Sequence, residues 1–137
     1  MSHHTKEKGD LGVLKAQLDL FEKGWTVCVP LTEHAPFDLM IHKDGVSKTV
    51  QVKYVAMHRG SIQLDLRSCW ADKNGVHSKS ADKLRVDIAC GYCPDTDECY
   101  YVDTSSFGDR VSLRIEDSKC RNRELIRWAE DYTEVPM

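Results

Sequence analysis

The sequence lacks any long hydrophobic run. No segment approaches the roughly 20 apolar residues that span a bilayer, and the opening residues, Met1 to Lys6, contain no apolar stretch of the kind found in a secretory signal. Proline and glycine are also scarce, with 4 and 8 among 137 residues, which excludes a collagen-like or low-complexity chain. We therefore expect one cytoplasmic domain over residues 1–137, with no membrane partner.

A disulfide framework is not expected, because a cytoplasmic protein keeps its thiols reduced. The Cys90-x-x-Cys93 pair, together with Cys99 and Cys120, could supply the four ligands of a tetrahedral zinc site. However, Cys90 falls within a predicted apolar strand. The pattern therefore favours buried thiols over a zinc site.

Excess positive charge is also lacking, since the net charge is −3. The charges are nevertheless distributed unevenly. Residues 42–85 hold 9 basic groups against 4 acidic ones, whereas residues 86–137 hold 6 against 12. This asymmetry indicates a basic face for an anionic partner, although charges that scatter over the surface would give the same count.

The first predicted element is a helix from about Lys8 to Lys23. Apolar residues recur there at spacings of three and four, as on one side of an amphipathic helix, and Gly24 follows where a left-handed C-terminal cap forms. This apolar stripe consists of Leu11, Leu14, Leu18 and Phe21.

Extended segments account for most of the remaining chain. Strands are predicted at 25–29, 37–42, 47–56, 61–67, 86–92, 100–103 and 111–115. The Asp44-Gly45 pair suits a tight hairpin, so the second and third strands should pair antiparallel. The polar segment 72–80 predicts an exposed loop, and 124–132 a short final helix. The order indicates an α/β (α+β) fold with a mixed or antiparallel sheet.

Asp38, Gln51 and Lys53 are the candidate chemical residues. Gln51 and Lys53 are two residues apart and share a face of their strand, while Asp38 lies on the strand paired with it. Carboxylate and amide oxygens suit Mg²⁺, and a lysine beside that cation can stabilise charge on a phosphate. The trio predicts phosphodiester hydrolysis. The alternative is that Asp38 only caps a turn and that Gln51 and Lys53 only form the solvent-exposed face of a strand.

A family resemblance extends over nearly the whole chain. It is carried by the segments Lys8-Gly9-Asp10, Pro36-Phe37-Asp38, Gln51-Val52-Lys53, Ser112-Leu113-Arg114-Ile115 and 126–132. These segments resemble the PD-(D/E)XK nucleases, in particular the homing endonucleases of cyanobacterial type that group I introns encode. The resemblance implies a restriction-endonuclease-like core, with Asp38 as the metal carboxylate, Gln51 in place of the usual acid and Lys53 as the catalytic lysine.

One position departs from that family. The family carries a Gly-Glu pair on its first helix, and Val13 follows Gly12 here. Asp10, three residues earlier and on the same side of the helix, is the expected replacement metal ligand, with Glu33 as a second candidate. If neither serves, the protein would be a catalytically silent DNA-binding protein. We expect Mg²⁺ as the cofactor, with Mn²⁺ able to substitute.

The resemblance predicts a homing-type DNA endonuclease that cleaves double-stranded DNA. A homodimer or homotetramer would provide a site for each strand, with the interface expected after Arg110. A nuclease that resolves branched junctions is another alternative. Basic residues near His58 and in the following segment are expected to contact DNA: Arg59, Arg67, Lys73, Lys79, Lys83 and Arg85.

Overall fold

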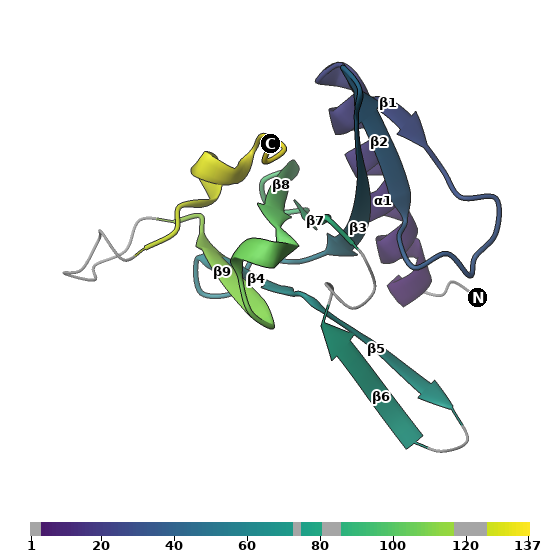
Figure 1. The fold of residues 1–137 in the computed structure, drawn as a ribbon. Helices are drawn as coiled ribbons and strands as arrows, with labels where there is room; N and C mark the ends of the chain where they lie inside the picture. The colour runs from purple at the N-terminus through teal and green to yellow at the C-terminus, as the bar shows by residue number, and fades with distance from the viewer. Residues whose placement is uncertain (1–3, 73–74, 81–85, 117–125) are drawn as a thin grey trace.

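A computed structural model describes residues 4–72, 75–80, 86–116 and 126–137 (Figure 1). Its elements are α1 (His4–Glu22), β1 (Thr26–Cys28), β2 (Leu39–Lys43), β3 (Val46–Tyr54), β4 (Ser61–Asp65), β5 (Arg67–Asp72), β6 (Gly75–Ser80), β7 (Ile88–Cys93), β8 (Glu98–Asp103) and β9 (Arg110–Arg114). Two 3-10 turns, η2 (Thr104–Ser106) and η4 (Ala129–Tyr132), follow β8 and end the chain's regular structure.

The main sheet has five strands in the order β1-β2-β3-β7-β8. β3 and β7 run parallel, whereas the other neighbouring pairs are antiparallel. Two further pairs, β4 with β9 and β5 with β6, are antiparallel. In Figure 1, α1 covers one face of the main sheet. The predicted mixed α+β architecture is therefore confirmed.

The predicted hairpin joins β2 and β3. Asp44 and Gly45 both have positive φ, at 50° and 81°, as a tight turn between twisted strands requires. The register pairs Leu39 with Val50 and Lys43 with Val46. This hairpin fixes the relative positions of the residues that flank it.

The main sheet is buried on both faces at β7, where every residue from Ile88 to Cys93 is buried, whereas β1 and β2 each expose one face. On the α1 side, one core cluster includes Leu20, Val50 and Tyr101. On the opposite side, a second cluster includes Leu64 of β4 and Leu113 of β9. β4 and β9 therefore provide apolar cover for the sheet face that α1 leaves open.

The predicted apolar stripe of α1 does not face the sheet. Gly12, Ala16 and Leu20 are buried instead, and a Cβ added at Gly12 would lie 3.6 Å from Val52 Cγ1. Small residues thus allow the helix to approach β3 closely. The exposed fractions of the stripe are 40% for Leu11, 61% for Leu14, 55% for Leu18 and 71% for Phe21.

Two other predictions are wrong within the described residues. Within the predicted loop 72–80, residues 75–80 form a strand, because β6 pairs with β5 along its whole length; residues 73–74 lie outside the described residues. The last helix is reduced to the 3-10 turn η4, and residues 126–128 are not helical. Residues 124–125 lie outside the described residues. In the part of the chain that the structure describes, no helix has the length and apolar character needed to cross a membrane.

Candidate functional site

Asp38 lies immediately before β2 and extends the pairing of β2 with β3. Its main-chain N–H donates to Val50 O at 2.9 Å. Its side chain then accepts a hydrogen bond from Val52 N at Oδ2, over 2.7 Å. The Asp38 carboxylate thus takes the place of a main-chain acceptor just before the start of β2.

The three predicted residues come together at this point of β3. Val50, Val52 and Tyr54 pack toward α1, so strand alternation places Gln51 and Lys53 on the opposite face. The bond to Val52 N holds the Asp38 carboxylate at the main-chain position that separates Gln51 from Lys53. The structure therefore brings the acid, the amide and the amine to one short stretch of the hairpin.

Small residues on β7 lie beside Gln51 and Lys53. The parallel register pairs Gln51 with Ala89 and Lys53 with Gly91. A Cβ at Gly91 would come within 2.4 Å of Leu64 Cδ2, so Leu64 packs directly against the glycine backbone. Leu64 is fully buried. This contact gives the site an apolar neighbour on the side of β4.

The environment of Asp38 opposes its ionisation. Burial raises the pKa of the Asp38 carboxyl above its ordinary value, while the hydrogen bond from Val52 and the charge of Lys53 act in the opposite direction. The positive charge of Lys53 favours the ionised form of the carboxyl. A bound cation would add to that effect and favour the ionised acid.

The donor set suits a hard divalent cation. Asp38 supplies a carboxylate and Gln51 an amide oxygen, and Mg²⁺ commonly binds proteins through one or two such groups while keeping several waters. Among the described residues, no three His, Cys, Asp or Glu side chains are grouped so that they could hold a metal ion. A site made from Asp38 and Gln51 would therefore depend on water or substrate oxygens for its other ligands.

The structure leaves the third protein ligand open. Asp10 and Glu33 are both exposed, and no hydrogen bond between described residues joins either of them to Asp38. Val13 is half-buried and packs against the core cluster on the α1 side. The position where the resemblance expects a glutamate thus contributes to packing.

The predicted basic residues fall in two places. Arg59 is exposed at a turn with φ of 52°, and its carbonyl accepts a hydrogen bond from Arg114 Nη1. Arg67 and Lys79 belong to the β5–β6 hairpin, which Figure 1 shows projecting from the rest of the chain. Three further residues, Lys73, Lys83 and Arg85, lie outside the described residues.

The β5–β6 hairpin was missed by the sequence analysis. An Asn-Gly pair, which is a strong hairpin signal, stands at positions 74 and 75, where β6 begins. Its polar surroundings led to the prediction of a loop. A two-stranded ribbon in a basic segment is a different kind of element from a loop, because its paired backbone can hold side chains in a fixed register.

The thiol prediction is confirmed for three cysteines, since Cys90, Cys93 and Cys99 are buried. Cys90 and Cys99 belong to the core cluster on the α1 side, whereas Cys93 belongs to the cluster on the opposite side. The Cys90-x-x-Cys93 pair therefore points to two different faces of the sheet and does not chelate one ion. Cys120 lies outside the described residues.

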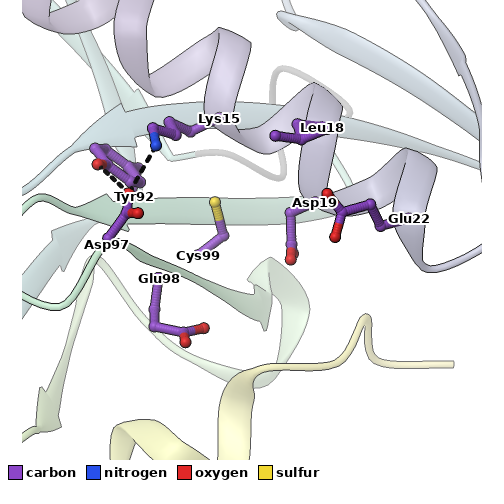
Figure 2. Close-up of a pocket in the computed structure, with 8 residues that line it drawn as sticks. All are labelled: Lys15, Leu18, Asp19, Glu22, Tyr92, Asp97, Glu98 and Cys99. Carbon is purple, nitrogen blue, oxygen red and sulfur yellow. Dashed lines mark hydrogen bonds and ion pairs between the residues drawn. The ribbon is translucent and has the colours of Figure 1, made fainter.

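A separate groove of about 250 Å³ lies between α1 and the β7–β8 hairpin (Figure 2). Lys15 Nζ lies 2.8 Å from Asp97 Oδ1 there, and Tyr92 Oη donates to the same oxygen at 2.7 Å. The groove is lined by Lys15, Leu18, Asp19, Glu22, Tyr92, Asp97, Glu98 and Cys99. It contains none of the three predicted site residues and is distinct from their site.

Comparison with known proteins gives matches that cover most of the chain. A family model described as PD-(D/E)XK endonuclease matches residues 3–135. The solved structure of a bacterial homing endonuclease, I-Ssp6803I, superposes with a TM-score of 0.74 at 23% sequence identity, covering 93% of this chain and 87% of that one. A search of curated protein sequences gives no match.

Proposed function

Because the chain belongs to the PD-(D/E)XK endonuclease family, we propose that it is a homing-type endonuclease that hydrolyses double-stranded DNA with Mg²⁺. The observation that carries this proposal is the position of the Asp38 carboxylate, bonded to Val52 N between Gln51 and Lys53. The fold shared with a bacterial homing endonuclease supports the homing type.

Each residue of the trio has a distinct role in this proposal. Asp38 and Gln51 would hold Mg²⁺, with Asp10 as the proposed third ligand. The bound cation would supply Lewis acidity toward a phosphate oxygen. Lys53 would position the attacking water and stabilise the negative charge that develops on the phosphate. The bond from Val52 keeps one Asp38 oxygen fixed, so that the carboxylate is oriented before substrate binds.

The β5–β6 hairpin is the proposed DNA-contacting element. The major groove of B-DNA admits a two-stranded β-ribbon, and Arg67 and Lys79 stand on the two strands of this one. Arg59 lies just before β4 on an exposed turn. We propose that these residues, with Lys73, Lys83 and Arg85, bind the phosphate backbone or base edges.

Two active sites that face opposite strand directions can cleave both strands in a single binding event. A two-fold symmetric homodimer supplies them with the smallest number of chains, and a homotetramer would supply two such pairs. We therefore propose that the nuclease acts as a homo-oligomer.

The test is a cleavage assay on plasmid and branched-junction DNA with Mg²⁺ or Mn²⁺. Lys53→Ala should reduce the rate by at least about a hundredfold, because it removes the group that stabilises developing charge. Lys48→Ala is the matched control, since Lys48 lies on the same strand away from Asp38. Cleavage that persists undiminished in Lys53→Ala would reject the assigned site, and a preference for junctions would favour a resolvase.

One observation favours a second candidate, a catalytically silent DNA-binding protein. Val13 packs in the core cluster at the position where the resemblance expects a carboxylate. A silent protein would bind duplex DNA with the usual steep salt dependence and would not cut it under any divalent cation. The same assay, combined with a binding measurement, distinguishes the two candidates.

A further inference from the structure

The outer side of α1 carries an apolar stripe that no described residue covers. Leu14, Leu18 and Phe21 are each more than half exposed, and Leu11 is 40% exposed. With 3.6 residues per turn, these positions lie opposite the buried Gly12, Ala16 and Leu20. A contiguous apolar surface of this kind usually marks a contact site. We infer that α1 packs antiparallel against α1 of a second copy of this chain.

The apolar residues of the stripe are arranged symmetrically along the helix. Leu14 and Leu18 lie in the middle of the stripe, and Leu11 and Phe21 lie at the two ends of the stripe. In an antiparallel pair, Leu14 of one copy would therefore pack beside Leu18 of the other, and Leu11 beside Phe21. The spacing of three, four and three residues is that of helices that pack along a common seam.

The charged residues that flank the stripe are complementary in the same arrangement. Lys8 and Glu22 are both exposed, and each is seven residues from Lys15, so all three line one side of the stripe. When two helices pack antiparallel about a two-fold axis near Lys15, Lys8 of each copy lies opposite Glu22 of the other. The symmetry thus creates two ion pairs between the copies, each between a lysine and a glutamate.

The residue at the axis does not oppose this packing. The two Lys15 side chains would approach each other there, but each is paired with Asp97 of its own chain at 2.8 Å. Figure 2 shows Leu18 and Glu22 on α1 together with this Lys15–Asp97 pair. The like charges at the centre are therefore compensated within each copy, which favours a second copy as the occupant of the stripe.

Other occupants fit this surface less well. A DNA backbone would meet an apolar stripe with the exposed acid Glu22 beside it. An anionic membrane would meet a helix side of mixed charge in a chain whose net charge is −3. A second copy of α1, in contrast, pairs the basic Lys8 with the acidic Glu22 across the two-fold axis. This inference deepens the proposed function, since a two-fold dimer would supply its two active sites.

The test is sedimentation equilibrium of the full chain without DNA. The wild-type chain should dimerise, and Leu18→Glu should raise the dissociation constant at least about thirtyfold, because it places two charges at the centre of the apolar contact. Leu31→Glu is the matched control, since Leu31 is fully exposed outside α1, and it should change nothing. Circular dichroism verifies that each variant is folded.

A charge exchange tests the antiparallel register. Lys8→Glu and Glu22→Lys should each weaken the dimer about threefold to tenfold, in line with exposed ion pairs, and the double variant should restore it. A monomeric wild-type chain, unchanged association of Leu18→Glu, or a double variant that stays as weak as its single parents would overturn the inference. A monomer that still cleaves DNA would reject the α1 interface alone, whereas a dimer that binds and cleaves no DNA would reject the nuclease.

Discussion

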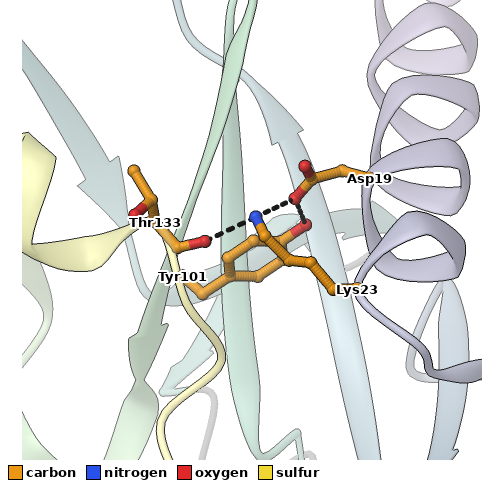
Figure 3. Close-up of polar contacts among 4 residues, drawn as sticks. All are labelled: Asp19, Lys23, Tyr101 and Thr133. Carbon is orange, nitrogen blue, oxygen red and sulfur yellow. Dashed lines mark hydrogen bonds and ion pairs between the residues drawn. The ribbon is translucent and has the colours of Figure 1, made fainter.

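Tyr101 Oη donates a hydrogen bond to Asp19 Oδ2 over 2.5 Å, which joins the interior of β8 to helix α1 (Figure 3). Lys23 Nζ donates to the same Asp19 oxygen at 2.7 Å and to the carbonyl of Thr133 at 2.6 Å. Helix α1 and β8 thus meet at the Asp19 carboxylate, and Lys23 links that carboxylate to the C-terminal segment. This contact holds the C-terminal segment against the face of the sheet that α1 covers.

The first prediction concerns this contact. Tyr101 is fully buried, and its hydroxyl bonds to a charged acceptor. Tyr101→Phe should therefore lower the free energy of unfolding by about 1.5 to 3 kcal/mol, as measured by urea denaturation. Tyr100→Phe is the matched control, because its hydroxyl lies 3.0 Å from the neutral Thr96 hydroxyl and should contribute about 0.5 to 1.5 kcal/mol. A smaller loss for Tyr101→Phe than for Tyr100→Phe would contradict this assignment.

The second prediction follows from the pKa of Asp38, which burial raises. The folded state then holds the Asp38 proton more tightly than the unfolded chain does. An unfavourable contribution to stability therefore develops as the pH rises through the raised pKa, and it is absent in acid. Asp38→Asn removes this charge and keeps an oxygen that can accept from Val52 N. The variant should be more stable than wild type at neutral pH and no more stable in acid.

Denaturation across a pH series measures this difference. Cleavage by Asp38→Asn should be lost at every pH, because the proposed metal carboxylate is gone. Higher stability at neutral pH together with loss of cleavage would show that the ionised Asp38 serves catalysis and lowers the stability of the fold. A variant that is less stable than wild type at neutral pH would indicate that the carboxylate is a structural cap for Val52.

The hairpin and the trio could be predicted from local chemistry. The Asp44-Gly45 pair favours one turn, and that turn fixes Leu39 opposite Val50. Strand alternation then places Gln51 and Lys53 on one face. In contrast, the parallel pairing of Gln51 with Ala89 joins strands far apart in sequence. No local pattern specifies that contact.

The orientation of α1 shows why periodicity alone was insufficient. The spacing of Leu11, Leu14, Leu18 and Phe21 correctly predicts a helix, but it does not show which side meets the sheet. A Cβ at Gly12 would already be in van der Waals contact with Val52, so the side of α1 that meets β3 has room for small residues and not for the leucines. The leucines are consequently left on the outer surface. Hydrophobicity identifies a face that must be covered, and the covering surface can belong to another chain.

The third prediction concerns the remaining metal ligand. If Asp10 completes the site, Asp10→Asn should raise the Mn²⁺ concentration for half-maximal cleavage by about tenfold or more, because loss of a supporting group at a metal site commonly costs 10–100-fold in affinity. Glu33→Gln is the matched control, as it removes a carboxylate that is equally exposed. The opposite result would assign the ligand to Glu33. If both variants need the same Mn²⁺ concentration as the wild-type chain, Asp38 and Gln51 would be the only protein ligands among these candidates.

The fourth prediction concerns the β5–β6 hairpin as the DNA-contacting element. If Arg67 and Lys79 neutralise phosphates, each change to alanine should weaken binding at low salt and reduce the slope of log affinity against log salt by about 1, because fewer counterions are released. Lys6→Ala is the control, since Lys6 is an exposed cation on α1. Fluorescence anisotropy with one duplex over a salt series measures both quantities. If Arg67→Ala and Lys79→Ala keep the wild-type slope while Lys6→Ala reduces it, the DNA lies against α1. The hairpin would then need another role.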